Sequence, residues 1–289
     1  MKKFSYAVIL LLVATGVVCA QDAGQPLIKS EVLKAHIMFE RQVWRRMDLK
    51  EKQNRPFFSR NGEVPRLLIQ AVREGLIKSY MSDSCVNLMP DDVFEENVSI
   101  EKQNFDQFGG GGGGFDSFGG GGGFGGGFGD TQTTTEPAPE QDTKEYDPIP
   151  PEMFSILYLK EDVVFDRNRS RMIWYIRSLS VAIPQSAGPT WNPAGFEKKV
   201  AHFKYQDVVD LFRGPYAEQA IWFNNQNQAQ HRNIGDALEL RLFRAPITKI
   251  SNADDLDIRQ LTSDPFEAIL MQQEYENDLM EYESELWEY

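Results

Sequence analysis

The sequence predicts an α+β fold with a helical N-terminal segment, a small antiparallel sheet and a long amphipathic C-terminal helix. Apolar residues recur at three- and four-residue steps near both ends of the chain, which is typical of amphipathic helices. Two runs rich in β-branched and aromatic residues, 154–160 and 171–183, predict strands. Because these strands are neighbours within a mixed order of elements, α+β is favoured over a parallel sheet.

The first 20 residues have the pattern of an export signal. Two lysines precede an apolar run, 7–13, that is shorter than the roughly 20 residues needed to span a membrane. Small residues precede a predicted cleavage between Ala20 and Gln21. We therefore expect an exported protein without a membrane span. A lipoprotein attached through Cys19 is the alternative, although the residues before it depart from a lipobox.

The cysteine count and the net charge argue against several classes of protein. The predicted cleavage leaves Cys85, which cannot form an internal disulfide and is expected to be buried. The formal net charge of -13 argues against nucleic acid and anionic membranes as main partners. The charge is polarised, since residues 29–80 carry twelve basic and six acidic side chains, whereas residues 260–289 carry nine acidic and no basic ones. These ends can attract each other within one protomer or head-to-tail between protomers.

A low-complexity stretch divides the chain. Residues 109–129 contain fifteen glycines, and a segment rich in Thr, Pro, Glu and Asp follows. Such a stretch loses too much backbone entropy on folding and buries almost nothing. The sequence therefore predicts four segments: a signal peptide (1–20), an N-terminal helical module (21–106), a disordered linker (107–150) and a C-terminal α+β module (151–289).

In the N-terminal module, an apolar stripe from Ile28 to Met47 predicts a helix that ends before Pro56. A second helix is expected from Pro65 to Gly75. Two helices of this size cannot enclose a core, so we expect them to pack against the C-terminal module or a partner.

In the C-terminal module, residues 166–170 supply the turn of a predicted hairpin. A strand at 200–205, a short helix at 206–212 and a strand or helix at 237–243 are expected to follow. The last element is a helix that begins at Pro265 and is capped by Ser263 or Asp264. Its apolar stripe reaches Leu286, and acidic side chains occupy much of its other face.

A catalytic motif is not found in the sequence. The three histidines lie far apart, and neither HExxH nor GxSxG occurs. We therefore predict a protein that is not an enzyme, with no catalytic, metal-binding or cofactor-binding residue. Glu161, Asp162 and Asp166 form a carboxylate cluster that we interpret as a solvated strand end. An exported enzyme built around Glu161 and Asp166 remains an alternative.

The order of residues from Val43 to Phe58, VWRRMDLKEKQNRPFF, resembles the signature of the gliding motility family GldN, also called PorN. The resemblance continues in blocks that cover most of the chain: residues 65–68, 74–80, 159–166, 237–243 and 285–289. The Gly-rich stretch resembles an insertion, and residues 191–230 match poorly.

This resemblance implies a non-enzymatic periplasmic scaffold of the type IX secretion and gliding motility machinery, associated with the inner face of the outer membrane. It implies self-association in a ring with a GldK- or PorK-like lipoprotein, and contact with the periplasmic segment of a GldM- or PorM-like motor protein. An exported Gly-rich structural or surface protein is the alternative function.

The aromatic and charged ends of the chain are candidates for partner contacts. The candidate partner-binding residues are Trp44, Arg45 and Arg46 at the basic end, and Leu286 and Trp287 at the acidic end. The competing interpretation is that Trp44 and Trp287 belong to the core of the protein itself.

Overall fold

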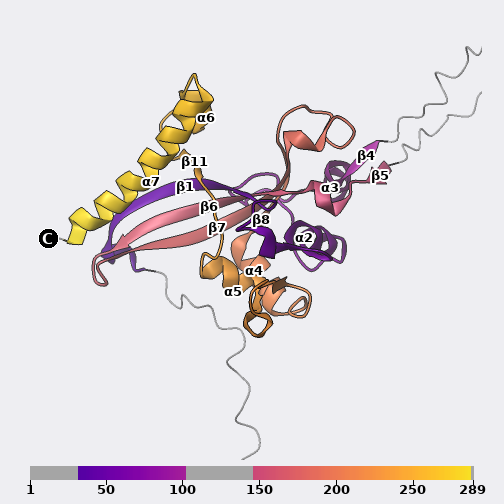
Figure 1. Ribbon diagram of the computed structural model, residues 1–289, viewed down its shortest axis with the longest axis horizontal. Helices are drawn as coiled ribbons and strands as arrows, with labels where there is room; N and C mark the ends of the chain where they lie inside the picture. The colour runs from indigo at the N-terminus through magenta and orange to yellow at the C-terminus, as the bar shows by residue number, and fades with distance from the viewer. Residues whose placement is uncertain (1–31, 102–145, 288–289) are drawn as a thin grey trace, which may run out of the picture.

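The computed structural model describes residues 32–101 and 146–287, so the predicted signal peptide and most of the predicted linker lie outside the described residues. One antiparallel five-stranded sheet, in the order β11-β1-β6-β7-β8, organises the molecule (Figure 1). Its strands are β1 (Ile37–Asp48), β6 (Ile156–Asp166), β7 (Arg171–Ile183), β8 (Lys198–Lys204) and β11 (Ile247–Ile250). Strands from both sides of the Gly-rich stretch therefore form a single sheet.

The prediction of a helix up to Met47 is wrong over β1, which is a strand. The apolar residues that suggested it, Phe39, Val43 and Met47, are four positions apart. This spacing places side chains on one face of a helix, but it also places them on one face of a strand, because four is a multiple of the strand period of two. Pairing with β6 along almost the whole strand, and with β11 at Val43–Arg45, decides between the two.

The other main elements agree with the sequence. The hairpin is confirmed, with β6 and β7 joined by a turn in which Ser170 has a φ of 48°. The helix predicted from Pro65 is confirmed as α2 (Val64–Arg73), and Gly75 follows it with a left-handed φ of 71°. Of the strand or helix predicted at 237–243, residues 237–239 belong to a helix, α5 (Ile234–Glu239), whereas residues 240–243 form a turn and loop. The further helices of the described residues are α3 (Asp91–Val98), α4 (Tyr205–Arg213), α6 (Ile258–Leu261) and α7 (Pro265–Trp287).

Short strands and turns complete the chain. In the part of the chain that the structure describes, three strand pairs are found outside the main sheet: β2 (Phe58–Ser59) with β3 (Gly62–Glu63), β4 (Ser99–Glu101) with β5 (Tyr146–Pro148), and β9 (Ile221–Trp222) with β10 (Arg232–Asn233). Single 3-10 turns are formed by Lys34–His36, Arg55–Phe57, Pro151–Met153, Gln185–Ala187 and Gln228–Gln230. None of the helices in the described ranges has the length and apolarity of a membrane span.

Two hydrophobic cores lie along the same face of the sheet strands. In β6, alternate residues share a face, and they pass from Leu157 and Leu159 in the first core to Val163 and Phe165 in the second. The first core contains residues of α2, α4 and α5, and the second contains residues of α7. Because the strands twist, this face turns along their length, so α7 lies above the sheet in Figure 1 and α4 and α5 lie below it. The position between the two cores on β6 is occupied by Glu161.

Candidate functional site

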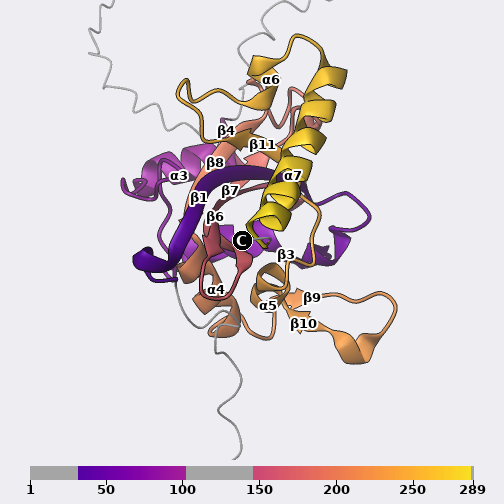
Figure 2. The same cartoon turned by 90° about the vertical axis from the view of Figure 1, so that its left-hand side faces the viewer.

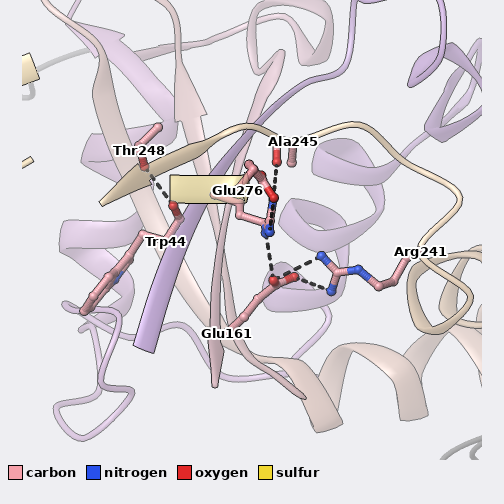
Figure 3. Close-up of polar contacts among 7 residues, drawn as sticks. Trp44, Glu161, Arg241, Ala245, Thr248 and Glu276 are labelled. Carbon is pink, nitrogen blue, oxygen red and sulfur yellow. Dashed lines mark hydrogen bonds and ion pairs between the residues drawn. The ribbon is translucent and has the colours of Figure 1, made fainter. Parts of the chain in front are cut away.

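Glu161 is the most deeply buried charged side chain of the sheet, with 0% of its surface exposed. It accepts one hydrogen bond from Arg45 Nε at 3.0 Å and two from the Arg241 guanidinium, at 2.8 and 3.1 Å (Figure 3). An isolated buried carboxylate would cost several kcal/mol. The two arginines are therefore what allows Glu161 to lie between the two cores as an ion.

Arg45 also pairs with the C-terminal helix and so links Glu161 to it. Its Nη1 and Nη2 donate to the two carboxylate oxygens of Glu276 in α7, at 2.5 and 3.1 Å, and Nη1 also donates to the carbonyl oxygen of Ala245. Only 6% of Arg45 is exposed. From its place on β1, one guanidinium thus contacts β6, the segment before β11 and α7; Figure 3 labels its partners Glu161, Ala245 and Glu276. We call Arg45, Glu161, Arg241 and Glu276 the ion-pair network.

An aromatic side chain completes the network. The guanidinium carbons of Arg45 and Arg241 lie 4.9 and 5.1 Å from the centre of the Trp174 ring, within the range of cation–π attraction. Arg241 reaches this position from a left-handed backbone, with a φ of 53°. The four charges sum to zero and each carboxylate is paired with arginine. This arrangement is suited to holding α7 in a fixed position on the sheet rather than to proton transfer.

The carboxylates that suggested an enzyme do not converge. Alternation along β6 places Glu161 on the opposite face from Asp162 and Asp166. Asp162 is paired with Arg177 at 2.6 Å, and Asp166 accepts from the backbone N–H of Asn168 at 2.9 Å. Within residues 32–101 and 146–287, no group of three or more His, Cys, Asp or Glu side chains could hold a metal ion.

The predicted contact residues at the basic end are already engaged within the chain. On the face opposite Arg45, Trp44 Nε1 donates to Asp83 at 2.6 Å, and Lys160 and Lys249 lie 5.1 and 4.7 Å from its ring centre. Arg46 forms three hydrogen bonds to the Glu197 carboxylate, of 3.0 to 3.2 Å. Reversing the charges of Arg45 and Arg46 would therefore disturb the fold itself, and other residues are better suited to test assembly.

At the acidic end, Leu286 is partly buried and packs against the second core. The side chain of Trp287, and both Ala20 and Gln21 of the predicted cleavage site, lie outside the described residues. The Arg45–Glu276 pair shows that the basic and acidic ends attract each other within one protomer. The network residues Arg241 and Glu276 were not singled out in the sequence, because nothing in the local pattern indicates which surface they face.

A family model described as gliding motility associated protein GldN matches residues 32–288. The chain belongs to the GldN family. The match begins just before β1 and includes every described residue, so the sheet, both cores and α7 are all features of a GldN-family chain. Comparison with curated proteins finds no match. Membership in this family makes the chain a gliding motility associated protein and confirms the resemblance found in the sequence.

One buried Ser–His pair in this GldN-family chain was not anticipated. Ser180 Oγ lies 2.6 Å from His202 Nδ1, and both side chains are buried. Burial lowers the pKa of His202 to about 4, with Lys199 acting in the same direction, so the imidazole is neutral at pH 7. The backbone of Tyr80 forms two hydrogen bonds with that of His202. We interpret the pair as a hydrogen bond that joins β7 and β8, because neither group is accessible to a substrate.

Cys85 is buried and unpaired, as predicted. Burial raises the pKa of its thiol from 9.0 to about 11. Because the thiolate is the reactive form, a shift of this size lowers the reactive fraction at pH 8 by about a hundredfold. We expect iodoacetamide to label Cys85 slowly in native buffer and rapidly in urea. Equal labelling rates in both conditions, followed by mass spectrometry, would show that the thiol is exposed.

Proposed function

We propose that this chain is a non-enzymatic scaffold of the type IX secretion and gliding motility machinery. In this proposal it lies in the periplasm at the inner face of the outer membrane. It forms a ring with a GldK-like lipoprotein and contacts the periplasmic segment of a GldM-like motor protein. The observation that carries the proposal is the GldN-family match over residues 32–288.

The geometry of the chain supports a scaffold role. A subunit of a closed ring must hold its contact surfaces at a constant angle, because small angular errors accumulate around the ring. Arg45, paired on one side with Glu161 and on the other with Glu276, fixes α7 relative to the sheet. The carboxylates point to different faces and are neutralised, so they do not form the convergent acid and base groups that an enzyme would need.

The proposal is tested by mixing the purified mature chain with the GldK-like lipoprotein of the same organism. We expect large ring-shaped assemblies in sedimentation and negative-stain microscopy only when both proteins are present. Deleting residues 108–129 is the matched control, since a secretion scaffold keeps its assembly whereas a protein that self-associates through its Gly-Phe tract loses it. Failure of the two intact proteins to co-assemble at micromolar concentration would contradict the proposed function.

A further inference from the structure

The helix α7 is apolar on two sides, and the sheet covers only one of them. Ala268 and Leu279 face the second core and are each 4% exposed. On the outward side, four large apolar side chains are at least half exposed: three lie within the first two turns of α7, and the fourth lies ten residues further along, beyond the exposed polar residues Gln273 and Asn277. The four are Phe266 (65%), Ile269 (53%), Leu270 (50%) and Met280 (61%). A helix that is apolar on two opposite sides is usually covered on both of them.

Acidic side chains border this outward apolar stripe. They recur at steps of three, four and seven residues, which places them along one edge of it. They are Glu267, Glu274, Asp278, Glu281 and Glu285, and all of them are exposed. The helix contains no lysine or arginine. The surface that covers α7 must therefore supply apolar contact together with positive charge.

The same chain carries a surface of this kind on another part of the fold. The turn after β1, residues 49–60, exposes Lys50, Lys52, Arg55 and Arg60 against one acidic residue, Glu51. We call it the basic turn. The backbone N–H of Phe223 donates to Pro56 in this turn at 3.2 Å, and the exposed side chains of Phe223 and Ile221 lie beside it on and next to β9. Basic and apolar groups are thus adjacent there.

The two surfaces do not meet within one chain. Figure 2 shows α6 and the start of α7 at the top of the molecule, and β9 and β10 at the bottom. In the described ranges, no hydrogen bond or ion pair joins α7 to residues 49–60. Their complementarity is therefore available for a contact between two copies of the chain.

We propose that the outward side of α7 in one copy docks on the basic turn of a second copy. The contact uses two different surfaces, so it is heterologous and propagates head-to-tail until it closes into a ring. This inference rests on the proposed ring function and assigns the contact between neighbouring subunits. It leaves the buried side of α7 and the ion-pair network unchanged.

A charge exchange between the two surfaces tests the contact. One variant carries Lys52→Glu and Arg55→Glu, and the other carries Glu274→Lys and Asp278→Lys. All four side chains are exposed. Each variant alone opposes like charges at every contact, so we expect it to lose assembly in the presence of the GldK-like lipoprotein. In an equimolar mixture each contact again joins opposite charges, so we expect assembly to return to the size of the wild type.

The matched control is a charge reversal of two exposed acidic residues elsewhere, Glu96→Lys with Glu152→Lys, which should assemble like the wild type. If both exchanged variants assemble alone, or if the mixture fails to recover, the contact is wrong while the proposed ring function stands. If the wild type itself does not assemble with the lipoprotein, both are wrong. If the exchange abolishes binding of the motor segment while assembly persists, α7 binds a different protein and the inference is overturned.

Discussion

Replacing Glu161 with alanine is expected to lower the free energy of unfolding by about 3–5 kcal/mol. The carboxylate is fully buried and is paired with both Arg45 and Arg241. Its removal leaves the Arg241 guanidinium without its ion-pair partner and Arg45 with only Glu276, while both remain beside Trp174. The loss is measured by urea unfolding of the purified protein, followed by far-UV circular dichroism and tryptophan fluorescence.

Two further variants distinguish the cost of leaving buried charge unpaired from the cost of losing packing contacts. Glu161→Gln keeps the shape of the side chain and its capacity to accept a hydrogen bond, but removes the negative charge. We expect it to cost less than alanine and more than a surface substitution. Combining Glu161→Ala with Arg45→Met and Arg241→Met removes the opposing charges and is expected to recover part of the loss, because apolar replacements of buried ion pairs are often tolerated. A loss below about 1 kcal/mol for Glu161→Ala would contradict the argument.

The second large effect is expected from Leu279→Ala in α7. Leu279 is 4% exposed and is the larger of the two buried side chains that α7 contributes to the second core, the other being Ala268. Truncation of a buried leucine costs about 2–5 kcal/mol. Because α7 is the last element and the first core does not include it, we expect the loss to appear as release of the helix while the rest of the sheet stays folded.

Hydrogen exchange followed by mass spectrometry distinguishes local release from global unfolding. In Leu279→Ala we expect faster exchange in residues 265–287 and unchanged protection in β6 and β7. Met280→Ala is a closely matched control, since it removes a similar side chain from the next position of the same helix, where 61% is exposed. If the two variants accelerate exchange equally, the second core does not hold α7 in place.

Local sequence patterns were sufficient to predict those elements whose end signals and apolar periodicity lie within or next to the element itself. The hairpin of β6 and β7 has two strand-forming runs and turn residues within thirty positions. The C-terminal helix begins as predicted at Pro265, and Asp264 caps it by accepting from the N–H of Phe266 at 3.1 Å. The burial of Cys85 followed from its residue type, and the family followed from the order of residues across the chain.

The error at β1 has a physical cause. Phe39, Val43 and Met47 fit a helix and a strand equally well by spacing, and the residues that decide, in β6 and β11, lie more than a hundred positions away. A local sequence pattern carries no information about which distant segments will pair with it. The burial of Arg45 could not be predicted for the same reason. A charged residue next to an apolar stripe is usually exposed, and only Glu161 and Glu276 make its burial possible.

The sequence by itself determined the family, the mixed α and β composition, the hairpin and the acidic C-terminal helix, because each rests on neighbouring residues or on the overall order of residues. The tertiary structure alone decided that the basic end forms an inner strand of the sheet and that one buried arginine joins this strand to α7. It also showed which side of α7 is left uncovered. These features depend on which distant segments pair, and that is set by the free energy of the whole fold rather than by any local pattern.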